Sequence, residues 1–264
     1  MPIWLYEMSS LRAALLLVAF IELVSLLGLF AARRFLTPRF HYGDGINDAV
    51  SGIVQAVGVF YGITVGLIAI GVWNTYSDAS RLVSSEASSI SALYRDVSGY
   101  PSPLREELRA HVRGYTVFVI EEVWPAQKTG QIPGRGTAIL DDFQERLYSF
   151  EPATQGQVAL HGETLRAYNS LLEYRRLRID AVNSGLSNTM WAVIWFGAAI
   201  SIGVAYLYRV EDAKLHATLV FLMAGFLALV LFMIIINDKP FFGYVSIPPT
   251  PYQLILDNVI DMSR

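Results

Sequence analysis

The chain has 264 residues, 53% of them hydrophobic, and a formal net charge of -3 at neutral pH. Its mean hydropathy of +0.41 is higher than soluble globular domains reach, which predicts an integral membrane protein. The small net charge excludes a general attraction to nucleic acid, and the lack of cysteine excludes disulfides and thiolate metal ligands. The four histidines do not have the spacing of a metal site, so we expect no metal and no cofactor.

Four apolar stretches are long enough to cross a bilayer as helices, at about 11–32, 49–73, 189–208 and 215–236. The predicted fold is therefore all-α, with four transmembrane helices. Membrane helices 1 and 2 occupy residues 1–73 and membrane helices 3 and 4 occupy residues 189–236. Residues 74–188 form a helical extramembrane region, made of long helices that continue from the second and third spans. Residues 237–264 form a proline-rich tail with a short amphipathic helix.

The first span carries Glu22 at its centre, and Arg33-Arg34 follows it directly, like a stop-transfer signal. A carboxylate at this depth is costly, so it should face protein or water rather than lipid. Two interpretations remain open. Glu22 is either a protonated side chain that is hydrogen-bonded to a neighbouring helix, or a functional group, namely a proton or cation relay or a pore-lining residue.

The second span contains a ladder of small residues. Gly58, Gly62 and Gly66 recur every four residues within a charge-free run, and Gly197 and Ser201 have the same spacing in the third span. Small residues at this interval allow a second helix to approach closely, which is how helices associate in lipid. We expect tight helix packing at both ladders.

The same second span is also the candidate pore lining. Which residues would form the constriction depends on the face that turns inward: Phe60 with Thr64, or Gln55 with Tyr61. A ring of hydrophobic side chains at the constriction can close a pore by dewetting.

The extramembrane region shows a seven-residue apolar repeat from Val158 to Leu186. This repeat predicts one long helix that packs along another and then enters the membrane near Thr189. Arg175, Arg176 and Arg178 lie just before that entry. They would either anchor the helix at anionic headgroups or form a basic vestibule that concentrates anions.

Four spans place both termini and the 74–188 region on one side of the membrane. The positive-inside rule does not decide which side, because basic residues near the helix ends are divided almost evenly. We predict a bacterial inner-membrane protein with the extramembrane region in the cytoplasm.

Several short motifs follow one another along the chain, among them Ser85-Glu86-Ala87, Glu122-Val123-Trp124-Pro125, and Asp238-Lys239-Pro240-Phe241-Phe242-Gly243. In this order they resemble the bestrophin-like family of bacterial and plant membrane proteins, formerly a domain of unknown function. The site residues that the resemblance marks are Glu122, Trp124, Pro125, Asp238, Pro240, Phe241 and Gly243. A second glutamate, Glu121, also precedes the tryptophan.

The resemblance implies a bestrophin-type layout, namely a pentameric anion channel with four membrane helices per subunit. The acidic cluster with which bestrophins bind calcium is absent after the fourth span. A charged Glu22 on the pathway would repel anions and would suit cations or protons instead.

Two main functions follow. The first is an oligomeric ion channel for small inorganic ions, expected to conduct anions. The second is a non-conducting scaffold or sensor that acts through its extramembrane helices, and a cation or proton channel that uses Glu22 is a further alternative. No nucleophile–base pair, Walker loop or nucleotide fingerprint is present, so an enzyme is not expected.

Overall fold

The computed structural model describes residues 8–36 and 45–263, and within these ranges every regular element is a helix. The chain divides into two compact units. The first, which we call the membrane unit, contains the chain up to Thr75 together with Gly185–Asp238. The second, the extramembrane unit, contains Tyr76–Ser184 and the segment from Lys239 onward.

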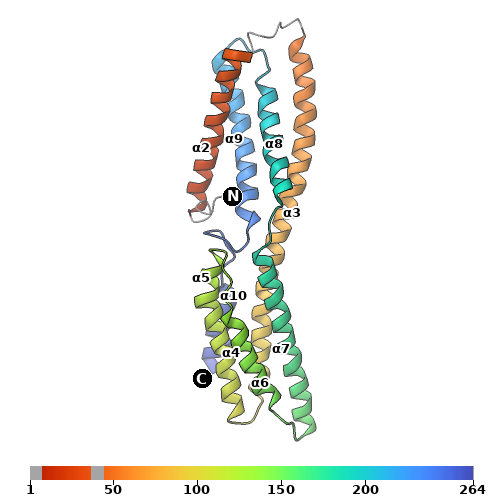
Figure 1. Cartoon of the computed structure of the whole chain (residues 1–264), viewed down its shortest axis with the longest axis vertical. Coiled ribbons are helices and arrows are strands. Elements are labelled where there is room, and N and C mark those ends of the chain that lie inside the picture. The colour runs from red at the N-terminus through yellow and green to blue at the C-terminus, as the bar shows by residue number, and fades with distance from the viewer. Residues whose placement is uncertain (1–7, 37–44, 264) are drawn as a thin grey trace. The chain divides into compact units, whose positions relative to one another are not determined.

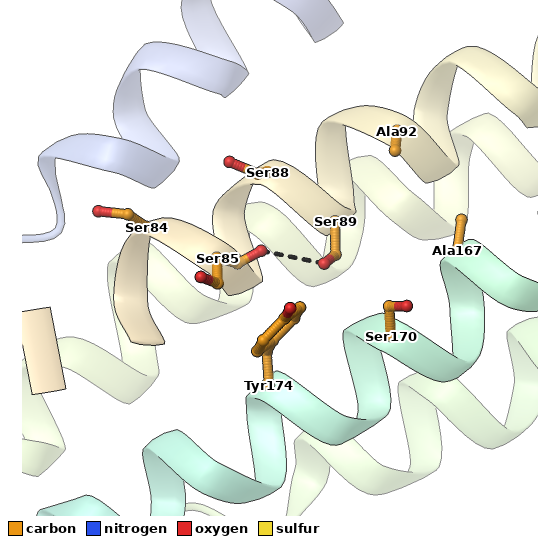
Figure 2. A pocket seen from close by; sticks show the side chains of 8 residues that line it. All are labelled: Ser84, Ser85, Ser88, Ser89, Ala92, Ala167, Ser170 and Tyr174. Carbon is orange, nitrogen blue, oxygen red and sulfur yellow. Dashed lines mark hydrogen bonds between the residues drawn. The ribbon is translucent and has the colours of Figure 1, made fainter. Parts of the chain in front are cut away.

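Within the described ranges, four helices are long and apolar enough to cross a membrane, as the sequence predicts. Helix α2 spans Ser10–Ala31 and continues as the π-helical turn η1, Ala32–Leu36. Helix α3 spans Ile46–Val97, α8 spans Asn188–Ala205, and α9 spans Ala213–Asp238. Figure 1 shows the arrangement, in which α9 contacts both α2 and α8. Helix α3 meets α8 through a hydrogen bond from Tyr61 Oη to the carbonyl oxygen of Ile194.

Small side chains allow the membrane helices to pack closely. Ala13 and Ser25 are buried on α2, and Ala224 and Ala228 are buried on α9, because these two helices lie against each other. Ser25 satisfies its hydroxyl within the helix by donating to the carbonyl oxygen of Ile21. Large apolar side chains point away from these contacts and remain exposed, as lipid-facing residues do.

The extramembrane unit is built on the second half of α3. Helix α4 spans Leu104–Phe118, η3 spans Val119–Val123 and α5 spans Trp124–Gln127. Helix α6 spans Arg135–Tyr148, α7 spans Gln155–Val182 and α10 spans Thr250–Ile255. The short turns η4, Leu256–Ile260, and η5, Asp261–Ser263, follow. These elements share one apolar core with α3, so the second span does continue beyond the membrane, as predicted.

The expectation that a long helix continues into the third span is wrong. Helix α7 ends at Val182 and α8 begins at Asn188. Lys239 Nζ donates to the carbonyl oxygen of Ser184 at 2.7 Å, and Asp238 Oδ1 accepts from the backbone NH of Leu186 at 2.6 Å. These bonds satisfy backbone groups that the break leaves without helical partners.

The predicted seven-residue row forms only part of the inner face of α7. Leu165 and Leu172 are partly buried against the core, whereas Val158 is 58% exposed and Leu186 lies beyond the end of the helix. The buried residues are Thr164, Tyr168, Leu171, Arg178 and Val182. Two of them, Thr164 and Arg178, are polar, and a search for apolar periodicity does not detect them.

Candidate functional site

The membrane part of α3 presents a large outward surface. Its buried residues, Val50, Tyr61, Val65 and Val72, fall on one side of the helix, as expected from the 3.6-residue period. The opposite side carries exposed apolar side chains: Ile53, Phe60, Ile63, Leu67 and Ile70. Among these Phe60 is 73% exposed.

The two sets of pore-lining candidates are not equivalent in the structure. Tyr61 is only 8% exposed and its hydroxyl donates to the carbonyl oxygen of Ile194 at 3.0 Å. Phe60 and Gln55 are exposed, whereas Thr64 is half-buried and donates to the carbonyl oxygen of Phe60 at 2.8 Å. Tyr61 is therefore used in packing α3 against α8 within the chain, and Phe60 is left on the outward surface.

The two small-residue ladders have different surroundings. A Cβ atom added at Gly197 would overlap the Tyr61 ring, so α8 needs glycine there. Ser201 is buried one turn later and donates to the carbonyl oxygen of Gly197. At Gly58, Gly62 and Gly66 an added Cβ would meet nothing within 4 Å among the described residues. The glycine ladder of α3 has no partner helix within the described chain.

Glu22 does not lie on α3 and is turned toward α9. Its Oε1 atom is 2.8 Å from the position that a Cβ on Gly225 would occupy. The absence of a side chain at Gly225 leaves room for the carboxyl group between the two helices. Glu22 is thus placed against protein, as the cost of exposing a carboxylate to lipid requires.

The motif residues of the extramembrane unit converge on a buried polar cluster. Glu86 on α3 accepts from Arg178 Nε at 2.5 Å and from the Tyr115 hydroxyl at 2.8 Å. All three side chains are almost fully buried. Burial lowers the pKa of Arg178, but the charge of Glu86 and its hydrogen bonds outweigh this, so the net pKa is raised and the guanidinium stays charged.

Trp124 extends this cluster toward the C-terminal segment. Its ring lies 5.6 Å from Arg178 Cζ and packs edge-on against Phe241 and Tyr252. Its Nε1 donates to the carbonyl oxygen of Ile247 at 2.8 Å. Two motifs that are far apart in sequence are therefore joined in one core.

The remaining motif residues hold turns or lie on the surface. Gly243 has φ +68°, which glycine adopts without strain, and its NH donates to the carbonyl oxygen of Lys128. Pro240 accepts from the NH of Ile247, and Asp238 supports the start of α8 as described above. Glu122 is exposed and forms an ion pair with Arg135, and Pro125 is exposed at the start of α5. Glu121 is exposed as well.

Sequence reasoning missed the role of Arg178. It is neither a headgroup anchor nor part of a vestibule, because it is buried against Glu86. A signal was available, since Arg178 falls on the same helical face as Leu171 and Val182, seven residues before and four after it. Arg175 is half-buried and donates to Thr137, and Arg176 is exposed.

Among the described residues, no cluster of histidine, aspartate and glutamate could hold a metal ion. The family model for the bestrophin-like domain matches residues 19–252. No curated protein sequence matches the chain.

The fold is similar to crystal structures of a bacterial bestrophin homologue from Klebsiella pneumoniae. One variant, with a tryptophan-to-alanine mutation, has a TM-score of 0.70 at 10% identity, over 98% of this chain and 99% of that chain. The structure solved by Zn-SAD phasing has a TM-score of 0.69 at 9% identity, over 94% and 98%. The match over 19–252 and the shared fold establish that the chain belongs to the bestrophin-like family.

Proposed function

We propose that the protein is one subunit of an oligomeric ion channel whose pore is lined by the membrane part of α3, and that it conducts small inorganic anions. The observation that carries the proposal is the outward surface of α3. Within the described chain its apolar side, with Phe60, and its glycine ladder have no partner. A helix that has no partner on two of its sides is suited to contact a neighbouring copy of the chain with one side and to line a central pore with the other.

The burial of Tyr61 favours one orientation of α3. Because Tyr61 packs on α8, Phe60 is the large side chain available for a constriction. The glycines would then face the adjacent subunit, where close approach of helices requires small residues. A ring of Phe60 side chains, one from each of five copies by analogy with bestrophins, would gate by dewetting.

Two features are compatible with anion conduction, which the proposal takes from the analogy with bestrophins. The stretch from Ala49 to Trp73 contains no charge that would repel an anion. Glu22, the only acidic residue of α2, is turned toward Gly225 on α9 rather than lying on α3. On this proposal Glu22 is off the pathway.

The test is a substitution at Phe60 in purified protein reconstituted into liposomes. Phe60→Ala should raise chloride flux, because it widens the apolar constriction. Phe20→Ala is the matched control, since Phe20 is a similarly exposed phenylalanine on α2. If Phe60→Ala and Phe20→Ala both leave flux and selectivity unchanged, α3 does not line the pore in this register.

We also propose that the channel lies in the bacterial inner membrane with the extramembrane unit in the cytoplasm. A reporter fused after Arg264 tests this orientation. Activity of a cytoplasmic reporter supports it, and a periplasmic signal would reverse it.

A further inference from the structure

We propose that the place where α2 ends and α9 begins is a binding site for an anionic phospholipid. A trough of about 500 Å³ lies there, between two membrane helices. We call it the arginine trough. The inference depends on the protein's being in a membrane and not on ion conduction.

The walls of the arginine trough suit an acyl chain. The small residues Ala213 and Ala217 at the start of α9 leave space beside Leu26, Leu29 and Phe30 of α2. Phe30 is 70% exposed, so the apolar wall continues onto the lipid-facing surface of α2. A chain lying in the trough would remain in contact with the bilayer along its length.

Arg33 at the rim is held firmly, and none of its partners in the described part of the chain is a carboxylate. Its Nη1 donates to the carbonyl oxygen of Val210 at 3.0 Å and lies 3.2 Å from His216 Nδ1, and its Nη2 donates to the carbonyl oxygen of Glu211 at 3.4 Å. His216 Nε2 faces the carbonyl oxygen of Ala205 at 3.1 Å, so the proton belongs on Nε2 and Nδ1 accepts from Arg33. These contacts orient the guanidinium but do not neutralise it.

Arg34 supplies a second, available charge. It is exposed, and within residues 8–36 and 45–263 no hydrogen bond or ion pair involves its side chain. Two carboxylates lie on the nearby α8–α9 connection, Glu211 and Asp212, and the latter accepts from the NH of Lys214 at the start of α9. Arg209 on this connection and Lys214 at the start of α9 offset both of them, so the two rim arginines leave a positive excess.

The combination of apolar walls and two guanidiniums at a membrane-helix end favours a lipid over a soluble anion. Guanidinium groups bind phosphate oxygens well, and basic pockets between membrane helices recognise anionic headgroups. A soluble phosphate would gain from the arginines but would leave the apolar walls unfilled. An anionic phospholipid would bind the arginines through its phosphate group and would fill the space between the apolar walls with an acyl chain.

The test measures lipid retained by full-length protein in mild detergent, by native mass spectrometry, during titration with phosphatidylglycerol or phosphatidylcholine. Phosphatidylglycerol should bind more tightly. Arg34→Gln should weaken the binding of phosphatidylglycerol about fivefold, which is the usual contribution of one basic residue at an anionic surface. The same variant should not change the binding of phosphatidylcholine. Ala213→Leu, which fills the trough without changing charge, should also weaken phosphatidylglycerol binding.

The matched control is Arg209→Gln, because Arg209 is an exposed arginine at the same membrane end but does not line the trough. Because Arg209 acts only by offsetting nearby carboxylates, this variant should weaken phosphatidylglycerol binding much less than Arg34→Gln does. Equal binding of the two lipids, or equal effects of Arg34→Gln and Arg209→Gln, would overturn the proposal. Displacement of phosphatidylglycerol by millimolar inorganic phosphate would show a soluble-anion site instead. The readout is lipid binding, so it is separate from any result on ion flux.

Discussion

Arg178 on α7 and Glu86 on α3 form an ion pair that is closed off from solvent, with exposures of 1% and 0%. A second contact joins Arg178 Nη2 to Glu86 Oε1 at 3.2 Å. Two charges are expensive to bury, and the pair compensates for this cost only because both partners are present and the Tyr115 hydroxyl donates to the same carboxylate. The ion pair and the Tyr115 hydroxyl therefore join α3, α4 and α7. We expect the loss of either charged side chain to leave a buried group without its partner.

The first prediction concerns the removal of one partner. Arg178→Met or Glu86→Gln should each destabilise the protein by about 3–5 kcal/mol, because each leaves an uncompensated buried group. Thermal unfolding in detergent measures this. Arg166→Gln is the control on the same helix, since its ion pair with Glu163 is exposed and should contribute at most about 1 kcal/mol.

The double variant Glu86→Gln/Arg178→Met sharpens the test. Removing both charges also removes the penalty of an unpaired charge, so the double variant should lose less stability than the sum of the two single losses. Additive losses would show that the two side chains act independently, in conflict with the contact between them.

The second prediction concerns alkaline pH. Burial, with a further contribution from the charge of Glu86, raises the pKa of Tyr115 and Tyr252 well above 10.0. Because the folded pKa is raised, the stabilising contribution is complete below the unfolded value of 10.0 and is lost as the pH rises through the folded pKa. Between the unfolded and the folded pKa, each tyrosine should therefore steepen the fall in the free energy of unfolding by about 1.4 kcal/mol per pH unit.

Unfolding measured between pH 8 and pH 12 checks this expectation. The variant Tyr252→Phe should show a shallower decline above pH 10 than the unmodified protein. An unchanged slope would mean that Tyr252 does not stay protonated in the folded state.

Much of this fold was predictable from the sequence, because long apolar stretches indicate membrane helices directly. The continuation of α3 beyond the membrane was also predictable, since helical periodicity persists past Trp73. The break between α7 and α8 was not predictable, because Asp238 and Lys239, which satisfy its backbone, lie 52 and 55 residues from their partners. The helical spacing of Leu171, Arg178 and Val182 could have marked Arg178 as inward-facing, but it could not identify the buried partner Glu86, 92 residues away.

The pore-lining candidates show a further limit of sequence reasoning. Both Phe60 and Tyr61 are aromatic and lie in a helix that is apolar on all sides. Only the contact with Ile194 and Gly197 distinguishes them, and that contact belongs to tertiary packing. Membrane helices often leave this choice open, because lipid and protein surroundings are equally apolar.

The third prediction concerns the close approach of Tyr61 to α8. Gly197→Ala should destabilise the protein by about 1–3 kcal/mol, because the new methyl group would overlap the Tyr61 ring. Gly203→Ala on the same helix is the control, because an added Cβ there meets nothing within 4 Å. It should be neutral or stabilising by up to about 1 kcal/mol, from helix propensity alone. Equal effects of the two substitutions would contradict the observed packing.

The fourth prediction concerns the glycine ladder of α3. The Cβ atom that Gly62→Val adds meets nothing within 4 Å among the described residues, so secondary structure should be preserved. If neighbouring subunits pack on this ladder, the variant should shift the protein toward monomer in size-exclusion chromatography with light scattering. An unchanged oligomer would place the ladder away from the subunit interface.

The fifth prediction concerns Glu22. Because its carboxyl group faces Gly225 on α9, Glu22→Gln should leave chloride flux unchanged. Gly225→Leu, which forces the carboxyl group out of this position, should destabilise the protein. A cation or proton flux that disappears with Glu22→Gln would instead put Glu22 on the pathway and would exclude an anion channel of the proposed type.

Ion flux into liposomes that carry the purified protein tests the central claim most directly, with chloride and potassium gradients applied separately. The proposed channel should pass chloride and should exclude potassium. Potassium flux without chloride flux would contradict the proposed selectivity. No flux of either ion, from protein shown to be folded, inserted and oligomeric, would contradict the channel itself and would favour a scaffold or sensor.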